Sequence, residues 1–153
     1  AASQSTFIFC GEPERSYRKT FEQACARLRG ARSDIQLNIE SRFVPDRRMA
    51  ALFKQSDVVL MPYTRSEYSS GILALAAEAR TPVIGPDTGL LGRLIRQNGL
   101  GVTCPVDPES LAENIAAAIR PPEVDEVRCD TFIQQSRPEQ FARIILDAVC
   151  NER

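Results

Sequence analysis

Short apolar runs alternate with stretches of helical periodicity along most of the chain. The runs are rich in β-branched and aromatic residues and end at glycine or proline, which is typical of β-strands. Between them, apolar residues recur every three or four positions, which indicates amphipathic helices. Strands are predicted at residues 6–10, 35–39, 57–63, 81–85 and 101–105. This alternation predicts an α/β fold: a doubly wound parallel sheet in three layers, with helices on both faces.

Two aspartates and one apolar run refine this prediction. Asp46 is predicted as the N-cap of a helix, and Asp107 followed by Pro108 is a stronger start because proline suits the first helical position. The run at 57–63 is almost wholly apolar, which is typical of a central strand covered on both faces. A further helix is predicted over 70–80, and its small apolar residues suggest that it is buried on all sides.

The end of the chain differs in character from the rest. Pro121-Pro122 breaks the pattern and an acidic stretch follows; Ser136 and Glu139 then fit a capping box before a final helix that runs to about residue 149. We therefore predict a single domain over 1–153, with an α/β core over 1–122 and a helical tail over 123–153.

Composition excludes several classes of protein. Lys and Arg number 19 against 20 Asp and Glu, a net charge of −1, which argues against a nucleic-acid-binding or anionic-membrane-binding protein. No apolar run approaches the roughly 18 residues of a membrane span, and the first residues do not resemble a signal peptide. These features predict a cytoplasmic protein that has no nucleic-acid partner.

The residues available for chemistry are restricted. The chain has no histidine, which excludes Ser-His-Asp and Cys-His catalysis and any imidazole metal ligand within it. Its five cysteines are scattered and form no C-x-x-C pair, so we expect buried thiols in a reducing compartment and no metal site. The five are Cys10, Cys25, Cys104, Cys129 and Cys150.

A ligand site is expected at the carboxyl ends of the strands, where open parallel sheets bind ligands. The loop at 63–70 is rich in hydroxyl groups and leads into a helix whose first amides could bind an anion, with Gly71 allowing close approach. Glu78 lies two turns further on the same face, roughly 10 Å away, which would suit the ribose of a nucleotide. The alternative is structural: Ser70 would only cap the helix, and Glu78 would only pair with an arginine.

The order of these segments resembles a known family. FVPDRRMAALFKQSDVVLMPY, SSGILALAAEARTPVIGPDTGLLGRLI, GLGV and DPESLAENIAAAI follow one another as in the C-terminal domain of retaining GT-B glycosyltransferases, glycosyltransferase family 4 in particular, over roughly residues 7–119. The resemblance implies a Rossmann-like domain that binds a nucleotide-sugar donor. It also implies that the N-terminal acceptor-binding domain and the Arg and Lys that neutralise the diphosphate are missing from this chain.

The resemblance also implies roles for individual residues. Glu78 matches the glutamate that holds the ribose hydroxyls, and Ser70 stands where the family has the carboxylate that contacts the sugar. Glu67, three residues before Ser70, would replace that carboxylate, so Ser70 and Glu67 are the candidate catalytic residues. The other implied donor contacts are the backbone of Gly71, Ile72 and Leu73, the base-bordering Phe43 and Val44, and Thr88 and Gly89 in a second loop. For Phe43 taken alone, packing in the core is the expected role.

The function implied is donor binding in a retaining, metal-independent hexosyltransferase. Its substrate would be a UDP- or GDP-sugar, its acceptor a glycan, lipid or small molecule, and its pathway polysaccharide or glycolipid biosynthesis. It needs no cofactor, and peripheral membrane association would arise only through the full-length enzyme. Alone, this chain is expected to bind the donor weakly and to transfer no sugar. The alternatives are a non-catalytic Rossmann-like module with a degenerate site, which Ser70 favours, and, with less support, a sugar-nucleotide epimerase.

Overall fold

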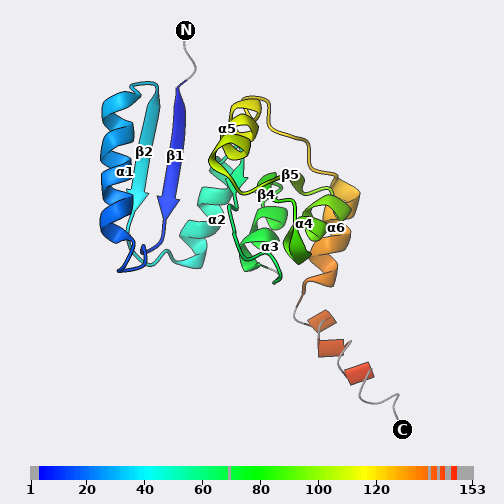
Figure 1. Ribbon diagram of the computed structural model, residues 1–153. Helices are drawn as coiled ribbons and strands as arrows, with labels where there is room; N and C mark the ends of the chain where they lie inside the picture. Colours follow the sequence, from blue (N-terminus) through cyan, green and yellow to red (C-terminus); the bar gives the residue numbers. More distant parts are fainter. Residues whose placement is uncertain (1–3, 69, 138, 141, 144–145, 148–153) are drawn as a thin grey trace. The chain divides into compact units, whose positions relative to one another are not determined.

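The computed structural model describes residues 4–68, 70–137, 139–140, 142–143 and 146–147. The chain forms two compact units, residues 1–49 and 50–153, and the boundary between them falls within helix α2 (Asp46–Gln55). Both units contain parallel strands and helices (Figure 1). The predicted α/β class with parallel strands is therefore confirmed.

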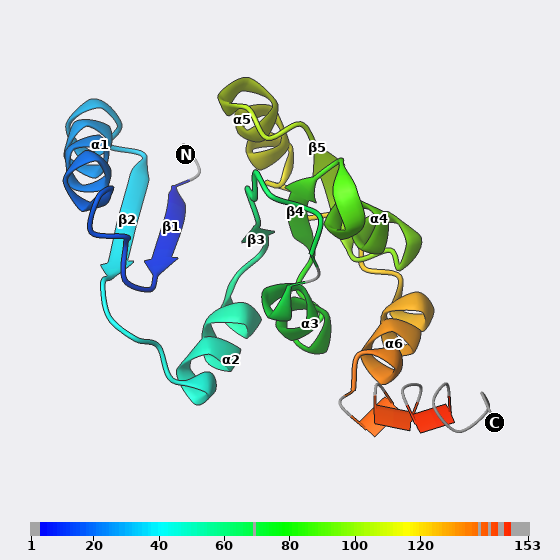
Figure 2. The same cartoon turned by 60° about the horizontal axis from the view of Figure 1, so that its bottom comes forward.

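The first unit is a two-stranded sheet with one helix. β1 (Ser5–Cys10) pairs in parallel with β2 (Ile35–Glu40), and α1 (Arg18–Ala31) joins them and contacts β2 (Figure 2). Phe9 of β1 and Phe21 of α1 stack edge to face with ring centroids 5.3 Å apart. The first two predicted strands and the helix between them are thus confirmed.

The second unit contains a three-stranded parallel sheet. β3 (Val59–Leu60), β4 (Val83–Pro86) and β5 (Gly101–Cys104) lie in that order, joined by α3 (Gly71–Glu78) and α4 (Gly89–Gln97). All residues of β4 are buried, and α4 contacts both β4 and β5. Because β4 is parallel to both neighbours, the carboxyl ends of the three strands lie along one edge.

The prediction of a central strand over 57–63 was wrong. Only two residues of this run form a strand, and β3 is the outer strand of its sheet, with Leu60 37% exposed. Pro62 has no amide hydrogen to donate to a neighbouring strand. The amide of Tyr63 turns back to the carbonyl of Met61 at 2.7 Å, which ends the strand. The central place belongs to β4.

The two predicted N-caps behave differently. Asp107 caps α5 (Pro108–Ala117) as predicted, because its Oδ1 accepts hydrogen bonds from the amides of Glu109 at 3.0 Å and Ser110 at 2.9 Å. These bonds to the charged carboxylate lower the pKa of Asp107. Asp46, in contrast, is already the first residue of α2, and the preceding Pro45 carbonyl accepts the first helical hydrogen bonds.

Replacing Asp107 by alanine is expected to lower the melting temperature at pH 7 by a few degrees, because the first amides of α5 lose their acceptor. A carboxylate whose pKa is lowered in the folded state stabilises the folded protein at pH values above its ordinary pKa of 3.8. This stabilisation disappears as the pH falls through the lowered pKa. The difference between wild type and Asp107→Ala should therefore shrink in acid.

Asp107→Asn is the matched control, since an asparagine caps as well as an aspartate but does not titrate. Thermal unfolding followed by circular dichroism between pH 2 and 7 measures both variants. An Asp107→Ala variant as stable as wild type at pH 7 would contradict the capping role.

The helical tail predicted over 123–153 begins with a separate helix whose start was not predicted from the sequence. α6 (Glu126–Gln135) begins after Asp125, whose side chain accepts the Arg128 amide at 3.0 Å, and it contacts α3 (Figures 1 and 2). Ser136, predicted to cap a later helix, is instead the C-terminal cap of α6. Of the predicted final helix, residues 139–140, 142–143 and 146–147 are helical, and the rest lies outside the described residues.

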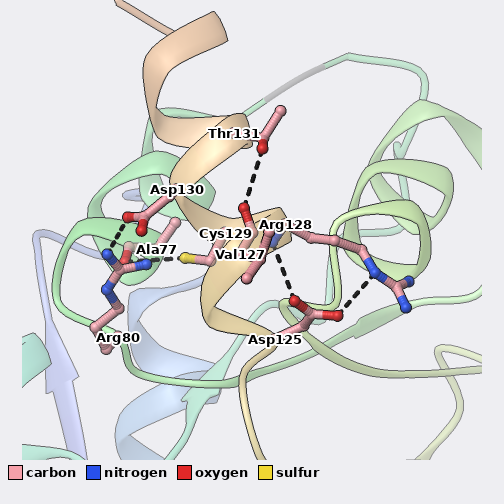
Figure 3. A network of polar contacts seen from close by, with 8 residues as sticks. All are labelled: Ala77, Arg80, Asp125, Val127, Arg128, Cys129, Asp130 and Thr131. Carbon is pink, nitrogen blue, oxygen red and sulfur yellow. Dashed lines mark hydrogen bonds and ion pairs between the residues drawn. The ribbon is translucent and has the colours of Figure 1, made fainter.

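Arg80 ties α6 to the turn that follows α3 (Figure 3). Its guanidinium forms an ion pair with Asp130 and lies beside the Cys129 thiol, which donates to the Ala77 carbonyl with a sulfur–oxygen distance of 3.4 Å. Arg80 has a φ of 57°, a left-handed conformation that ordinary residues rarely adopt. Burial raises the pKa of the Cys129 thiol, as expected for a thiol inside the core.

The other cysteines follow the same trend. Cys25, Cys104 and Cys129 are buried, which confirms the prediction for these three, and Cys10 is half-buried. Cys150 lies outside the described residues.

Among the helices of the described part of the chain, none combines the length and apolar character needed to cross a membrane.

Candidate functional site

Two helices begin at the carboxyl edge of the second unit's sheet. The loop after β3 leads into α3, and the loop after β4 leads into α4. Each helix start presents amides without intrahelical partners and a partial positive charge. The predicted loops at 63–70 and around Thr88 and Gly89 therefore lie at the same edge of one unit.

Ser70 caps α3. Its backbone is extended, its Oγ accepts the Ile72 amide at 3.2 Å, and its carbonyl accepts the Leu73 amide at 3.0 Å. This is the structural role that the sequence also allowed. In the described part of the chain the Gly71 amide has no hydrogen-bond acceptor, and a Cβ built on Gly71 meets no atom within 4 Å. An anion can therefore approach the backbone at this point.

Ile72 and Leu73 follow Gly71 in the first turn of α3. Ile72 is half-buried and Leu73 is fully buried, and both amides are occupied by Ser70. Of the three residues whose backbone was expected to face the donor, Gly71 alone offers a free amide among the described residues.

The loop before α3 carries exposed polar and aromatic side chains. Glu67 and Tyr68 are exposed, while Ser66 beside them is only 4% exposed. Glu67 is the carboxylate nearest in sequence to the start of α3, and it forms no ion pair with any described residue. Its carboxylate oxygens therefore have no ionic partner in the described part of the chain.

Thr88 and Gly89 at the start of α4 contact the same loop. The hydroxyls of Thr88 and Ser66 lie 3.2 Å apart, and the Leu91 amide donates to the Ser66 carbonyl at 2.9 Å. The structure thus brings Thr88 and Gly89 together with the loop that carries Glu67. Sequence reasoning gave Ser66 no role, because nothing in the local pattern marks it as buried.

Glu78 lies at the far end of α3. It is the last helical residue and is exposed, as is Gly71, so the predicted shared face is confirmed. The helix buries Leu73, Ala76 and Ala77, which corrects the expectation of burial on all sides. α3 runs from the carboxyl edge toward the amino end of β4, so Glu78 lies about 10 Å from the helix start, the separation expected from the sequence. Its role in ribose binding stays a prediction.

Phe43 and Val44 belong to the first unit. Phe43 is 82% exposed and Val44 is buried, so the expectation that Phe43 packs in the core was wrong. An exposed aromatic ring after β2 is free to stack on a base.

At the same end of β2, Glu40 accepts a 2.5 Å hydrogen bond from Arg48, which lowers the pKa of Glu40.

An arginine that the sequence did not single out reaches the carboxyl edge of the second unit. Arg96 lies on α4, and its Nη1 donates to the Asp87 carbonyl at 2.7 Å and to Thr103 Oγ1 at 3.3 Å. The guanidinium places a positive charge beside the loop that precedes Thr88.

Among the described residues, no three cysteine or acidic side chains gather as metal ligands.

Comparison with known proteins agrees with this arrangement. The chain is similar in structure to AviGT4, a glycosyltransferase involved in avilamycin A biosynthesis, with a TM-score of 0.52 and 21% identity. The match covers 84% of this chain and 42% of AviGT4, so the chain spans less than half of that protein. Similarity at this level shows a shared fold, the Rossmann-like fold of GT-B enzymes. No curated protein matches the chain significantly.

The sequence itself matches a described family. The profile of the family "Glycosyl transferases group 1" matches residues 1–121, which is most of the chain. The resemblance to GT-B glycosyltransferases drawn from the order of its segments is confirmed at the level of family and fold. This chain belongs to the glycosyl transferases of group 1.

Proposed function

We propose that this chain is the part of a glycosyltransferase that binds the nucleotide-sugar donor, a UDP- or GDP-sugar. The proposal rests on one observation in a chain of this family: the starts of α3 and α4 lie at the same edge of the sheet, together with the loop that carries Glu67. The open amide at Gly71 and the start of α4 would face the diphosphate. Glu67 would accept hydrogen bonds from the sugar.

The chemistry of sugar transfer explains why such a site can work. Breaking the bond between sugar and phosphate leaves negative charge on the departing diphosphate. Fixed amide dipoles stabilise that charge without a protein nucleophile or a histidine, and the chain has no histidine. We propose that transfer retains the anomeric configuration, requires no metal and is completed by an acceptor-binding domain outside this chain.

Glu67→Gln tests the site directly. Titration calorimetry of the chain with UDP-glucose and GDP-mannose identifies the better donor, and the free nucleotide diphosphate is then measured beside it. We expect Glu67→Gln to weaken sugar-nucleotide binding about tenfold, since the hydrogen bonds from the sugar lose their negatively charged acceptor. Binding of the free diphosphate should hardly change, because Glu67 contacts the sugar.

Glu113→Gln is the control, since Glu113 is an exposed carboxylate on α5 with no ion pair among the described residues. Equal loss of affinity for the sugar nucleotide and the free diphosphate in Glu67→Gln would contradict the sugar contact. Repeating the titration in EDTA tests independence from metal.

Glu78→Ala tests the ribose role that the resemblance implies for the last residue of α3. If Glu78 accepts hydrogen bonds from the ribose hydroxyls, we expect the affinity for the nucleotide diphosphate to fall about tenfold, and the loss to shrink with the 2′-deoxy nucleotide. An affinity within about twofold of wild type would contradict the ribose role.

The second candidate function is a non-catalytic module with a degenerate site. It is favoured by one observation: Ser70, at the position of the family's sugar-contacting carboxylate, spends its hydroxyl on capping its own helix. The calorimetric experiment separates the two functions. Measurable binding of a sugar nucleotide by the wild-type chain supports the glycosyltransferase, and none supports the module.

A further inference from the structure

Ser66 is a buried polar residue between two exposed neighbours. It is 4% exposed, whereas Arg65 and Glu67 are exposed. Buried polar groups require partners, and Ser66 finds two at the start of α4. Its Oγ lies 3.2 Å from Thr88 Oγ1, and its carbonyl accepts the Leu91 amide at 2.9 Å.

The start of α4 depends on these contacts. Thr88 occupies the N-cap position, yet its side chain forms no capping hydrogen bond. The Leu91 amide belongs to the first turn, where amides have no partner inside the helix. The Ser66 carbonyl fills this place, so the cap of α4 comes from a loop 22 residues earlier in the chain.

Gly89 allows the two loops to approach each other. Its φ of +65° lies in the left-handed region, and a Cβ built on it would lie 2.4 Å from both the carbonyl oxygen and the Oγ of Ser66. No side chain fits in this space without pushing the Ser66 backbone away. Glycine is therefore required here for its conformation and for its small size.

We propose that the contact of Ser66 with Thr88, Gly89 and Leu91, here called the Ser66 lock, positions Glu67 for the sugar of the donor. The inference rests on the proposed function and adds a positioning residue to it. Ser66 is buried and touches no ligand itself. It fixes the backbone immediately before Glu67 against α4, so that the carboxylate and both helix starts keep one geometry.

A double-mutant cycle tests whether Ser66 acts through Glu67. Ser66→Ala removes the hydroxyl contact with Thr88 and is expected to weaken sugar-nucleotide binding about fivefold, with the free diphosphate bound nearly as before. In the Ser66→Ala background, Glu67→Gln should cost less than about twofold instead of tenfold, because residues in one network are not additive. Ser33→Ala removes an exposed hydroxyl in the turn before β2, outside the candidate loop, and should bind like wild type.

The melting temperature of each variant separates positioning from stability. A purely structural role for Ser66 would lower the melting temperature while leaving the tenfold effect of Glu67→Gln intact in the Ser66→Ala background. That result, or unchanged binding in Ser66→Ala, would overturn the inference.

Hydrogen exchange at the Leu91 amide tests the lock without any ligand. We expect Gly89→Ala to accelerate this exchange at least tenfold relative to wild type, because the added Cβ displaces the Ser66 carbonyl. Unchanged exchange would overturn the lock even if the chain binds donors. If wild type binds no sugar nucleotide, the proposed function fails and so does the positioning role of Ser66, while the exchange measurement still decides whether the lock exists.

Discussion

Replacing Gly101 by alanine is expected to destabilise the second unit by about 3 kcal/mol or more. Gly101 opens β5 with a φ of +146°, and a Cβ built there would lie 2.1 Å from the Val83 carbonyl oxygen and 2.5 Å from the Val83 nitrogen. Both contacts are with the backbone of the central strand β4, which cannot move without breaking the sheet. The substitution therefore forces β4 and β5 apart.

Gly30→Ala is the matched control for Gly101→Ala. Gly30 lies within α1, no atom lies within 4 Å of an added Cβ, and its φ is not in the left-handed region. This substitution should stabilise the first unit by about 0.5–1 kcal/mol, since alanine favours the helix. Urea denaturation followed by circular dichroism measures both variants. Similar midpoints for Gly101→Ala and wild type would show that β4 and β5 tolerate a side chain between them.

Replacing Phe132 on α6 by alanine is also expected to lower the free energy of unfolding by a large amount. Phe132 is 7% exposed, and α6 contacts α3. Phe132→Ala removes most of a buried ring and leaves a cavity, which should cost about 3–5 kcal/mol of unfolding free energy. Because α6 covers part of α3, the loss should extend to the helix whose start forms the candidate site.

Val127→Ala provides the comparison on the same helix. Val127 is 77% exposed, so its truncation should change the unfolding free energy by less than about 0.5 kcal/mol. Urea denaturation of both variants tests the contrast. If the two substitutions cost the same, α6 does not use Phe132 to pack against the rest of the second unit.

The pattern of the sequence was sufficient for most elements of the fold. Strand positions followed from apolar runs that end at glycine or proline, as at β1 and β5. The start of α5 followed from Asp107 and Pro108, because capping and the fixed φ of proline act within a few residues. Effects of this range can be read from neighbouring residues.

α6 lies within the predicted helical tail, but its sequence explains why its start was not located. It reads EVRCDTFIQQ, with two buried residues, Cys129 and Phe132, among polar ones. This is too weak a period to stand out after two prolines. The usable signal was Asp125 followed by Glu126, an N-cap with an acidic first turn. The central position of β4 could not be predicted either, because strand order depends on pairing between distant segments.

The candidate site, like the fold, was predictable from the sequence only in part. The amino-acid sequence alone was enough to identify the hydroxyl-rich loop, the start of α3 and the start of α4, since each is a local pattern of small and capping residues. Only the tertiary structure shows that Ser66 contacts Thr88 and Gly89. Hydrogen bonds and close contacts between segments 22 residues apart depend on how strands and helices pack, and no local pattern encodes that packing.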